Sequence, residues 1–116
     1  CTTALHLLLA GLGIADGDEV IAPDCTWVGS VACITYQRAK TVFADVDPIH
    51  WCLTPESIEK AITPKTKAVI VVDLFGNMPD WTGIKEVASY ISRANNFDWN
   101  AGLRLLQPGE IPASKS

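Results

Sequence analysis

Three places in the sequence combine polar or aromatic side chains with a position where a small ligand could bind. Thr2 and Thr3 stand at the start of an apolar stretch that predicts a helix. Hydroxyls and unpaired backbone N–H groups at a helix N-terminus suit a phosphate, but Thr is also a common helix cap. Trp27 follows a short apolar stretch and either offers a flat face for stacking or packs in the core. Asp73 ends a long apolar run, where its carboxylate either contacts a ligand or satisfies a turn.

Glycines and acidic residues elsewhere are weaker candidates for a site. Gly11 and Gly13 follow a predicted helix instead of a strand, so they do not form a dinucleotide-binding fingerprint. Asp45 and Asp47 lie on one side of a predicted strand end. They could bind a cation there, but a solvated turn beside Pro48 is the favoured alternative.

The cysteines give no pattern typical of a metal site or a disulfide framework. They form no C-x-x-C pair, and neither histidine has ligand-like spacing to them; the four are Cys1, Cys25, Cys33 and Cys52. We therefore expect no metal and no disulfide framework, and we expect the cysteines to be small buried residues in a reducing cytoplasm. Cys25 stands where a nucleophile could, at a strand-to-helix turn, yet neither His6 nor His50 is placed as an obvious base.

Helices and strands that would position these residues alternate along the chain. Apolar periodicity, caps and breakers predict helices over 3–12, about 28–39, after Thr54-Pro55 and after Asp80, and strands over 19–22, 41–46 and 67–74. This order is typical of an α/β fold with a parallel sheet covered by helices on both faces. Three strands make a thin sheet, and the chain starts in mid-motif, so we expect a partial, three-layer α/β/α domain.

Composition excludes several classes of protein. The 116 residues are 48% hydrophobic and carry a net charge of −4, which excludes a disordered chain and a basic nucleic-acid binder. No stretch approaches the roughly 18 apolar residues of a membrane span. Only 19% of the residues are charged, against about 25% in an average domain. This low fraction predicts that part of the surface is covered, as in a homo-oligomer.

The periodic pattern fails near the C-terminal end of the sequence. Asn, Gly and Pro interrupt residues 93–116, which end in Ala-Ser-Lys-Ser. We therefore expect a folded unit over 1–92 and a divergent, mobile tail over 93–116.

Consecutive motifs of the first 92 residues resemble one enzyme family. TTALHLLLAGLGIADGDEVIAPDCTWVGSVACI, then FADVDP, then TPESIEKAITPKTKAVIVVDLFGNMPD is similar to the sugar-nucleotide aminotransferases of the DegT/DnrJ/StrS group. The resemblance implies a pyridoxal 5′-phosphate (PLP) enzyme of the aspartate-aminotransferase fold, of which this chain is part of the large domain. It implies that Thr2 and Thr3 hold the cofactor phosphate and that Trp27 stacks on the pyridine ring. Asp73 would border the substrate side, at a position that is usually His in the family.

The reaction implied by the resemblance moves an amino group, commonly from glutamate, to a keto sugar nucleotide in amino-sugar or polysaccharide biosynthesis. The cofactor needs a Schiff-base Lys and an acid at the pyridine nitrogen, and the family has both downstream of the matched region. None of the six lysines lies in the family's lysine motif. We therefore expect a truncated, cytoplasmic fragment of a homodimeric transaminase that has no catalytic residue and is inactive alone.

Two alternatives from other classes stay open. The chain could be a small non-catalytic α/β module that binds a phosphate ligand or associates with itself through its unpaired sheet edges. It could also be an independent enzyme that uses Cys25, which is the poorer hypothesis.

Overall fold

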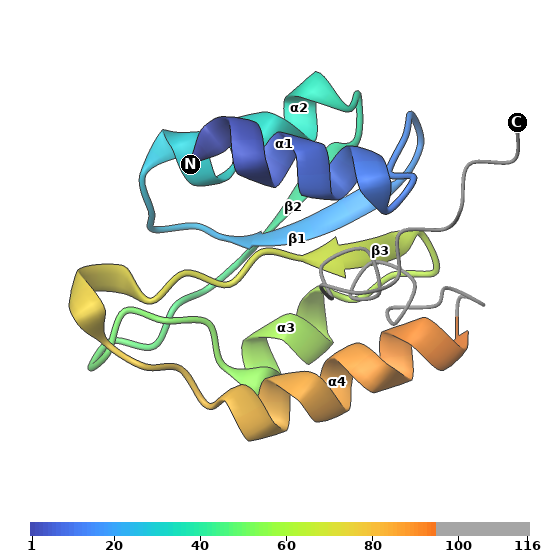
Figure 1. Ribbon diagram of the computed structural model, residues 1–116. Helices are drawn as coiled ribbons and strands as arrows, with labels where there is room; N and C mark the ends of the chain where they lie inside the picture. Colours follow the sequence, from blue (N-terminus) through green and yellow to red (C-terminus); the bar gives the residue numbers. More distant parts are fainter. Residues whose placement is uncertain (95–116) are drawn as a thin grey trace, which may run out of the picture.

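A computed structural model of the chain describes residues 1–94. Within them the elements follow in the order α1 (Thr2–Gly11), β1 (Glu19–Pro23), η1 (Val28–Ser30), α2 (Ala32–Tyr36), β2 (Lys40–Ala44), α3 (Pro55–Ala61), β3 (Thr66–Val69), η2 (Leu74–Gly76) and α4 (Trp81–Ala94). The strands form a parallel sheet of order β2-β1-β3. Figure 1 shows α1 and α2 on one face of this sheet and α3 and α4 on the other. The predicted three-layer α/β fold is confirmed.

The central strand β1 divides the hydrophobic core into two clusters. All five of its residues are buried. Val20 and Ala22 pack into the cluster beneath α1 and α2, whereas Ile21 packs into the cluster above α3 and α4. Side chains of a strand alternate between faces, so a strand covered on both faces must be apolar throughout. The continuous apolar run of β3 has the same cause, since Ala68 and Val69 join opposite clusters.

The predicted helix over 28–39 is wrong in its middle. The chain forms a 3₁₀ turn, η1, and then the short helix α2, with Val31 between them at φ −113°. The sequence predicts Asp24 or Thr26 as the cap of this helix, but neither caps either piece. Trp27 and Val31 are the N-cap residues, and neither side chain accepts a capping bond. A stretch that contains Val28, Gly29 and Val31 has low helix propensity, which explains the break.

The predicted strand over 67–74 is too long at its C-terminal end. Ile70 N still donates to Ile21 O at 2.8 Å, but β3 itself ends at Val69. Successive residues of β1 direct their backbone N–H and C=O groups alternately toward β3 and toward β2. Ile21 O accepts from the β3 side, whereas Asp24 N donates to Ala44 O of β2. Position 23 therefore faces β3, and Pro23 has no N–H to donate. The ladder stops there, and the next residues leave the sheet.

The second predicted strand is also shorter than expected, and two predicted caps are confirmed. β2 ends at Ala44, and Val46 instead forms an isolated antiparallel bridge with Leu53. Thr54 and Ser57 form a reciprocal capping box at the start of α3. At α4, Asp80 Oδ1 accepts from Gly83 N at 3.1 Å.

In the sequence, the buried stripe predicted for the fourth helix consists of Trp81, Ile84, Ala88 and Ile91, and the helix buries it only in part. Ile84 and Ile91 are buried, but Trp81 is exposed. The helix includes Arg93 and Ala94, and the rest of the predicted tail lies outside the described residues. None of the helices within 1–94 has the length and apolar character needed to cross a membrane.

Candidate functional site

Thr2, Trp27 and Gly29 meet at the start of α1, and we call this group the cradle. A Cβ atom added at Gly29 would lie 2.8 Å from Thr2 Oγ1 and 2.9 Å from Trp27 Cδ1 and Nε1. Such separations are too short for any real side chain. Only glycine at position 29 therefore lets the hydroxyl and the indole approach the same point from two elements.

The fold places the cradle at the carboxyl-end edge of the sheet. β1 ends at Pro23, the chain bends over 24–26, and η1 then packs against α1. Figure 1 shows the start of α1, η1 and η2 on the same side, beyond the ends of the strands. In open parallel sheets this edge is where ligands bind.

The first turn of α1 leaves hydrogen-bond donors free for an anion. Cys1 is the N-cap and its carbonyl accepts from Leu5 N at 3.1 Å, but no side chain of residues 1–94 caps the helix. The backbone N–H groups of Thr2 and Thr3 therefore have no partner inside the helix. The alternative that these threonines are caps is wrong. Both hydroxyls and the positive end of a ten-residue helix are available to a phosphate.

The indole of Trp27 lies on the surface. The residue is 77% exposed and has an extended backbone before η1. The alternative that Trp27 is a core aromatic is therefore wrong, and the ring is free to stack on a planar ligand.

Thr26, next to Trp27, carries a buried hydroxyl without a partner. Its Oγ1 atom finds no hydrogen bond within the described residues. An unsatisfied buried polar group costs about 1–3 kcal/mol. Together with the free donors of α1 and the space left by Gly29, this orphaned atom fits a site completed by a polar group from outside residues 1–94. The residues present thus fit an anion carried on a flat ring.

Asp73 lies on the same edge but apart from the cradle contacts. It is exposed, follows β3 and is the N-cap of η2. Its carboxylate forms no capping bond, hydrogen bond or ion pair within the described chain, and only its backbone carbonyl accepts, from Gly76 N at 3.2 Å. The alternative that this carboxylate satisfies a turn is wrong.

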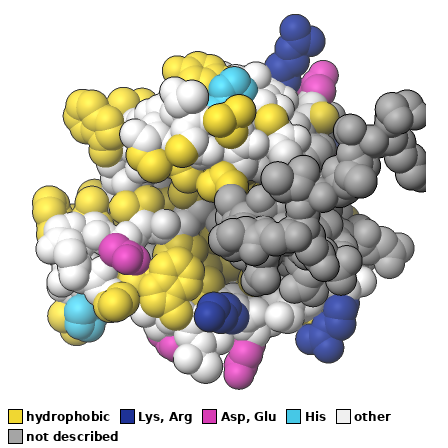
Figure 2. Space-filling model, in the orientation of Figure 1, with side chains coloured by type: hydrophobic (Ala, Val, Ile, Leu, Met, Phe, Trp, Pro, Cys, Tyr) yellow, Lys and Arg dark blue, Asp and Glu magenta, His cyan; other side chains and the backbone are white. Residues whose placement is uncertain are grey.

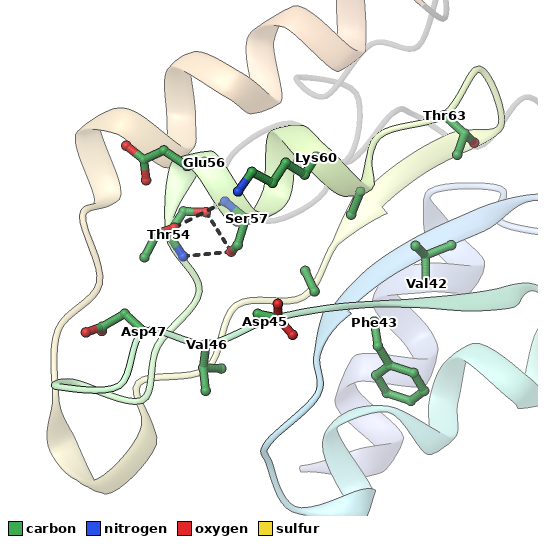
Figure 3. Close-up of a pocket in the computed structure, with 12 residues that line it drawn as sticks. Val42, Phe43, Asp45, Val46, Asp47, Thr54, Glu56, Ser57, Lys60 and Thr63 are labelled. Carbon is green, nitrogen blue, oxygen red and sulfur yellow. Dashed lines mark hydrogen bonds between the residues drawn. The ribbon is translucent and has the colours of Figure 1, made fainter.

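A hollow of about 600 Å³ lies elsewhere, between β2 and α3 (Figure 3). Its polar side chains include Asp45, Glu56 and Lys60, and Thr54 and Ser57 are already occupied with each other. It contains neither Thr2, Thr3, Trp27 nor Asp73, so we assign it no role in the site.

The loop after β2 confirms a turn in place of a cation site. Asp47 Oδ1 accepts from Ile49 N at 2.9 Å and from His50 N at 3.2 Å. These backbone bonds, with His50 nearby, lower the pKa of Asp47. Among residues 1–94 no group of three or more His, Cys, Asp or Glu side chains is arranged to hold a metal ion.

All four cysteines are free thiols. Cys33 and Cys52 are buried as predicted, but Cys1 is exposed and Cys25 is half-buried, so the expected burial is wrong for these two. His6 packs against the Tyr36 ring, with 5.4 Å between centroids, and His50 pairs with Asp47. Neither imidazole forms a hydrogen bond with Cys25 in the described part of the chain. Burial raises the pKa of the Cys33 thiol, which makes it less reactive.

Comparison with known proteins matches the chain to one family of aminotransferases and to members of it. The sequence matches the model of the DegT/DnrJ/EryC1/StrS aminotransferase family over residues 1–92. Over 87 residues it is 48% identical to L-glutamine:2-deoxy-scyllo-inosose aminotransferase of Streptomyces kanamyceticus, covering 75% of this chain and 20% of the relative. It is 46% identical over 87 residues to GDP-perosamine synthase of Escherichia coli O157:H7, covering 75% of this chain and 24% of that protein.

A solved structure shares the fold and holds a cofactor. NtdA from Bacillus subtilis, solved with bound cofactor PMP, superimposes with a TM-score of 0.74 and 32% identity over 77% of this chain and 20% of that chain. The chain thus spans about a fifth to a quarter of the length of the proteins it matches.

Proposed function

The chain belongs to the DegT/DnrJ/EryC1/StrS aminotransferase family, and we propose that it forms the part of a PLP-dependent aminotransferase that holds the cofactor. The cradle is the observation that carries this proposal. It joins free helix N-terminal donors, a half-buried threonine hydroxyl and an exposed indole at one point.

Each residue of the proposed site has a separate task. The N–H groups and hydroxyls of Thr2 and Thr3 donate to the cofactor phosphate, and the helix dipole favours its negative charge. Trp27 stacks on the pyridine ring and fixes its plane. The cofactor, when bound, supplies the electron sink that amino transfer requires. Asp73 borders the substrate side.

For the whole enzyme we propose transfer of an amino group to the ketone of a sugar nucleotide, a free sugar or a related cyclitol. The named relatives support the cyclitol and the sugar nucleotide, since one acts on 2-deoxy-scyllo-inosose and another is a GDP-perosamine synthase. The sequence predicted glutamate as donor, and the name of the first relative specifies L-glutamine. We propose an amino acid of this pair as the donor, a cytoplasmic location, and a homo-oligomer.

We also propose that the Schiff-base lysine comes from outside the folded unit of residues 1–92. Lys40 pairs with Glu19 and Lys67 with Asp18, both at the amino-end edge of the sheet. Lys65 precedes β3 at that same edge, and Lys60 and Lys85 lie on α3 and α4, which cover the face opposite to α1. The chain by itself is then expected to show no amino transfer from glutamate or glutamine to a keto sugar nucleotide. Turnover at ordinary enzymatic rates would contradict this.

Titration with pyridoxamine 5′-phosphate, followed by tryptophan fluorescence, tests the cofactor site. We expect saturable binding that falls at least tenfold in the Thr2→Val, Thr3→Val double variant. Thr82→Val, an exposed threonine on α4, is the matched control and should bind as the unmodified chain does. Pyridoxamine without its phosphate should bind poorly. No saturable binding, or equal binding by the double variant, would overturn the proposal.

A second candidate, a self-associating module, keeps one observation in its favour. On α1, Leu7 is 69% exposed and Leu8 is 40% exposed. Sedimentation velocity of the unmodified chain and of the double variant, together with the titration, separates the two functions. In a pure assembly module both proteins would associate equally, and the unmodified chain would bind no pyridoxamine 5′-phosphate.

A further inference from the structure

The loop after β3 carries an exposed aromatic side chain on a strained backbone. Phe75 is 82% exposed, and its backbone has a φ of +56°. Gly76 follows with a φ of +78°. The left-handed region is rare for a bulky residue, and exposure of a phenyl ring forgoes the gain of burial. Two unfavourable features therefore coincide in one residue.

Hydrogen bonds from two directions hold this loop. Within it, Gly76 N donates to Asp73 O at 3.2 Å and Asn77 N donates to Leu74 O at 3.0 Å. From the loop after β2, His50 O accepts from Asn77 Nδ2 at 2.8 Å, and Cys52 Sγ donates to Asn77 O at 3.7 Å. Strained residues persist where their surroundings fix them, and they gather at ligand sites.

The loop lies on the edge of the sheet that carries the cradle. Figure 1 places η2 beyond the carboxyl ends of the strands, as it does η1, and Figure 2 shows exposed hydrophobic side chains along this edge. Asp73, two residues before Phe75, has an exposed carboxylate without a partner in the described chain. An aromatic face and a free carboxylate thus stand together on one short, fixed loop.

We propose that Phe75 and Asp73 form a subsite for the polyhydroxylated ring of the amino acceptor, a proposal that rests on the function proposed above. Sites for small ligands combine aromatic surface with a few polar groups that fix orientation. The phenyl ring packs against the C–H face of a sugar or cyclitol ring, and the carboxylate accepts hydrogen bonds from its hydroxyls. Because a carboxylate repels a phosphate, the loop meets the ring and not a nucleotide diphosphate.

The test uses the full chain saturated with pyridoxamine 5′-phosphate and two probes, 2-deoxy-scyllo-inosose and UDP-N-acetylglucosamine. Binding is measured by saturation-transfer NMR and by the shift of the Gly76 amide. Phe75→Gly removes the ring and relieves the left-handed backbone, because glycine adopts positive φ freely. Phe75→Tyr keeps an aromatic face. Tyr36→Ala, at the end of α2 beside the opposite edge of the sheet, removes another exposed aromatic as the control.

We expect Phe75→Gly to weaken binding of at least one probe tenfold or more while the cofactor affinity stays unchanged. Phe75→Tyr and Tyr36→Ala should bind within about twofold of the unmodified chain, and Asp73→Asn should weaken binding as well. If Phe75→Gly bound the probes as tightly as the unmodified chain does, or if the unmodified chain bound neither probe, this inference would be overturned and the cofactor proposal would stand. An altered sedimentation coefficient with unchanged ring binding would show that Phe75 contacts another protein surface and would also overturn it. Failure to bind pyridoxamine 5′-phosphate would instead overturn the proposed function.

Discussion

Gly29 shows how one missing side chain can organise a site. The Thr2 hydroxyl and the Trp27 indole both lie within contact of the position that its Cβ would take. Thr2 and Trp27 could be predicted from the sequence, because a hydroxyl at a helix start and an aromatic after a strand have recognisable uses. Gly29 could not, since its importance depends on two elements that meet in space. Its place in a turn after a buried strand was the only available signal.

Replacement of Gly29 by Val tests this arrangement. We expect the added side chain to displace Trp27 and rotate the Thr2 hydroxyl, so that pyridoxamine 5′-phosphate binds at least tenfold more weakly. Stability should change by less than about 1 kcal/mol, because the displaced indole is already exposed. Fluorescence titration and urea unfolding measure the two effects. Val28→Leu, at the exposed neighbouring residue, is the control, and an unchanged affinity of Gly29→Val would contradict the account.

Glu19 is a buried carboxylate at the opposite edge of the sheet. It accepts hydrogen bonds from Thr63 Oγ1 and from Lys40 Nζ. The Thr63 hydroxyl is the main cause that lowers the pKa of Glu19 below its usual 4.5, and burial opposes the shift. The Lys40 side chain is 72% exposed, so its ion pair contributes little in water.

Because the pKa of Glu19 is lower in the folded chain, its charge stabilises the fold above about pH 4.5 and that contribution disappears as the pH falls through the folded value. Glu19→Gln should therefore lower the free energy of unfolding by about 1 kcal/mol at pH 7. The difference from the unmodified chain should shrink toward pH 3, as measured by urea unfolding at both pH values. Exposed Glu59→Gln is the control. A difference that does not change with pH would show that the charge of Glu19 is not responsible.

At the scale of elements, the sequence predicted the starts of α3 and α4 correctly, whereas element ends that depend on hydrogen-bond partners in other strands were predicted wrongly. Thr54-Pro55 and Asp80 predicted two helix starts correctly because a cap depends on residues three positions apart. The ends of β3 and of the helix predicted over 28–39 were wrong. The end of β3 depends on Pro23 in the neighbouring strand β1, and the break in the helix predicted over 28–39 depends on the packing of η1 against α1.

The capping box at the start of α3 is expected to stabilise the fold. Thr54→Ala removes the acceptor of the 3.2 Å bond from Ser57 N, and we expect a loss of about 1 kcal/mol in unfolding free energy. Thr54→Ser keeps the hydroxyl and should lose less than half of that. Thermal and urea unfolding measure both variants. Equal losses in Ala and Ser variants would indicate that the methyl group, and not the cap, is responsible.

At the scale of the whole molecule, the sheet lies between two hydrophobic clusters. The alternation of helices and strands in the sequence predicted that both faces of the sheet are covered. Ile21 is fully buried in the cluster beside α3 and α4. Ile21→Ala should cost about 3 kcal/mol by loss of burial and by the cavity it leaves. Ile49→Ala, at a residue that is 77% exposed, should cost less than about 0.5 kcal/mol. Urea unfolding compares them, and a small loss at Ile21 would show that burial in this cluster contributes little to the stability of the fold.

The two ends of the parallel strands carry different kinds of residues. Ion pairs that involve Lys40 and Lys67 close the amino ends of the strands, whereas the carboxyl ends carry the cradle and the η2 loop. The alternation of elements predicted this polarity, because parallel strands place all their carboxyl ends together. The relative position of Asp73 and Phe75 required the folded loop, since left-handed backbone at an aromatic residue has no sequence signal.

The most direct measurement is a ¹H–¹⁵N correlation spectrum of the chain recorded as pyridoxamine 5′-phosphate is added. We expect the largest shifts at the amides of Thr2, Thr3 and Gly29 and at the indole N–H of Trp27. Shifts confined to the hollow between β2 and α3, or no saturable shifts at all, would contradict it.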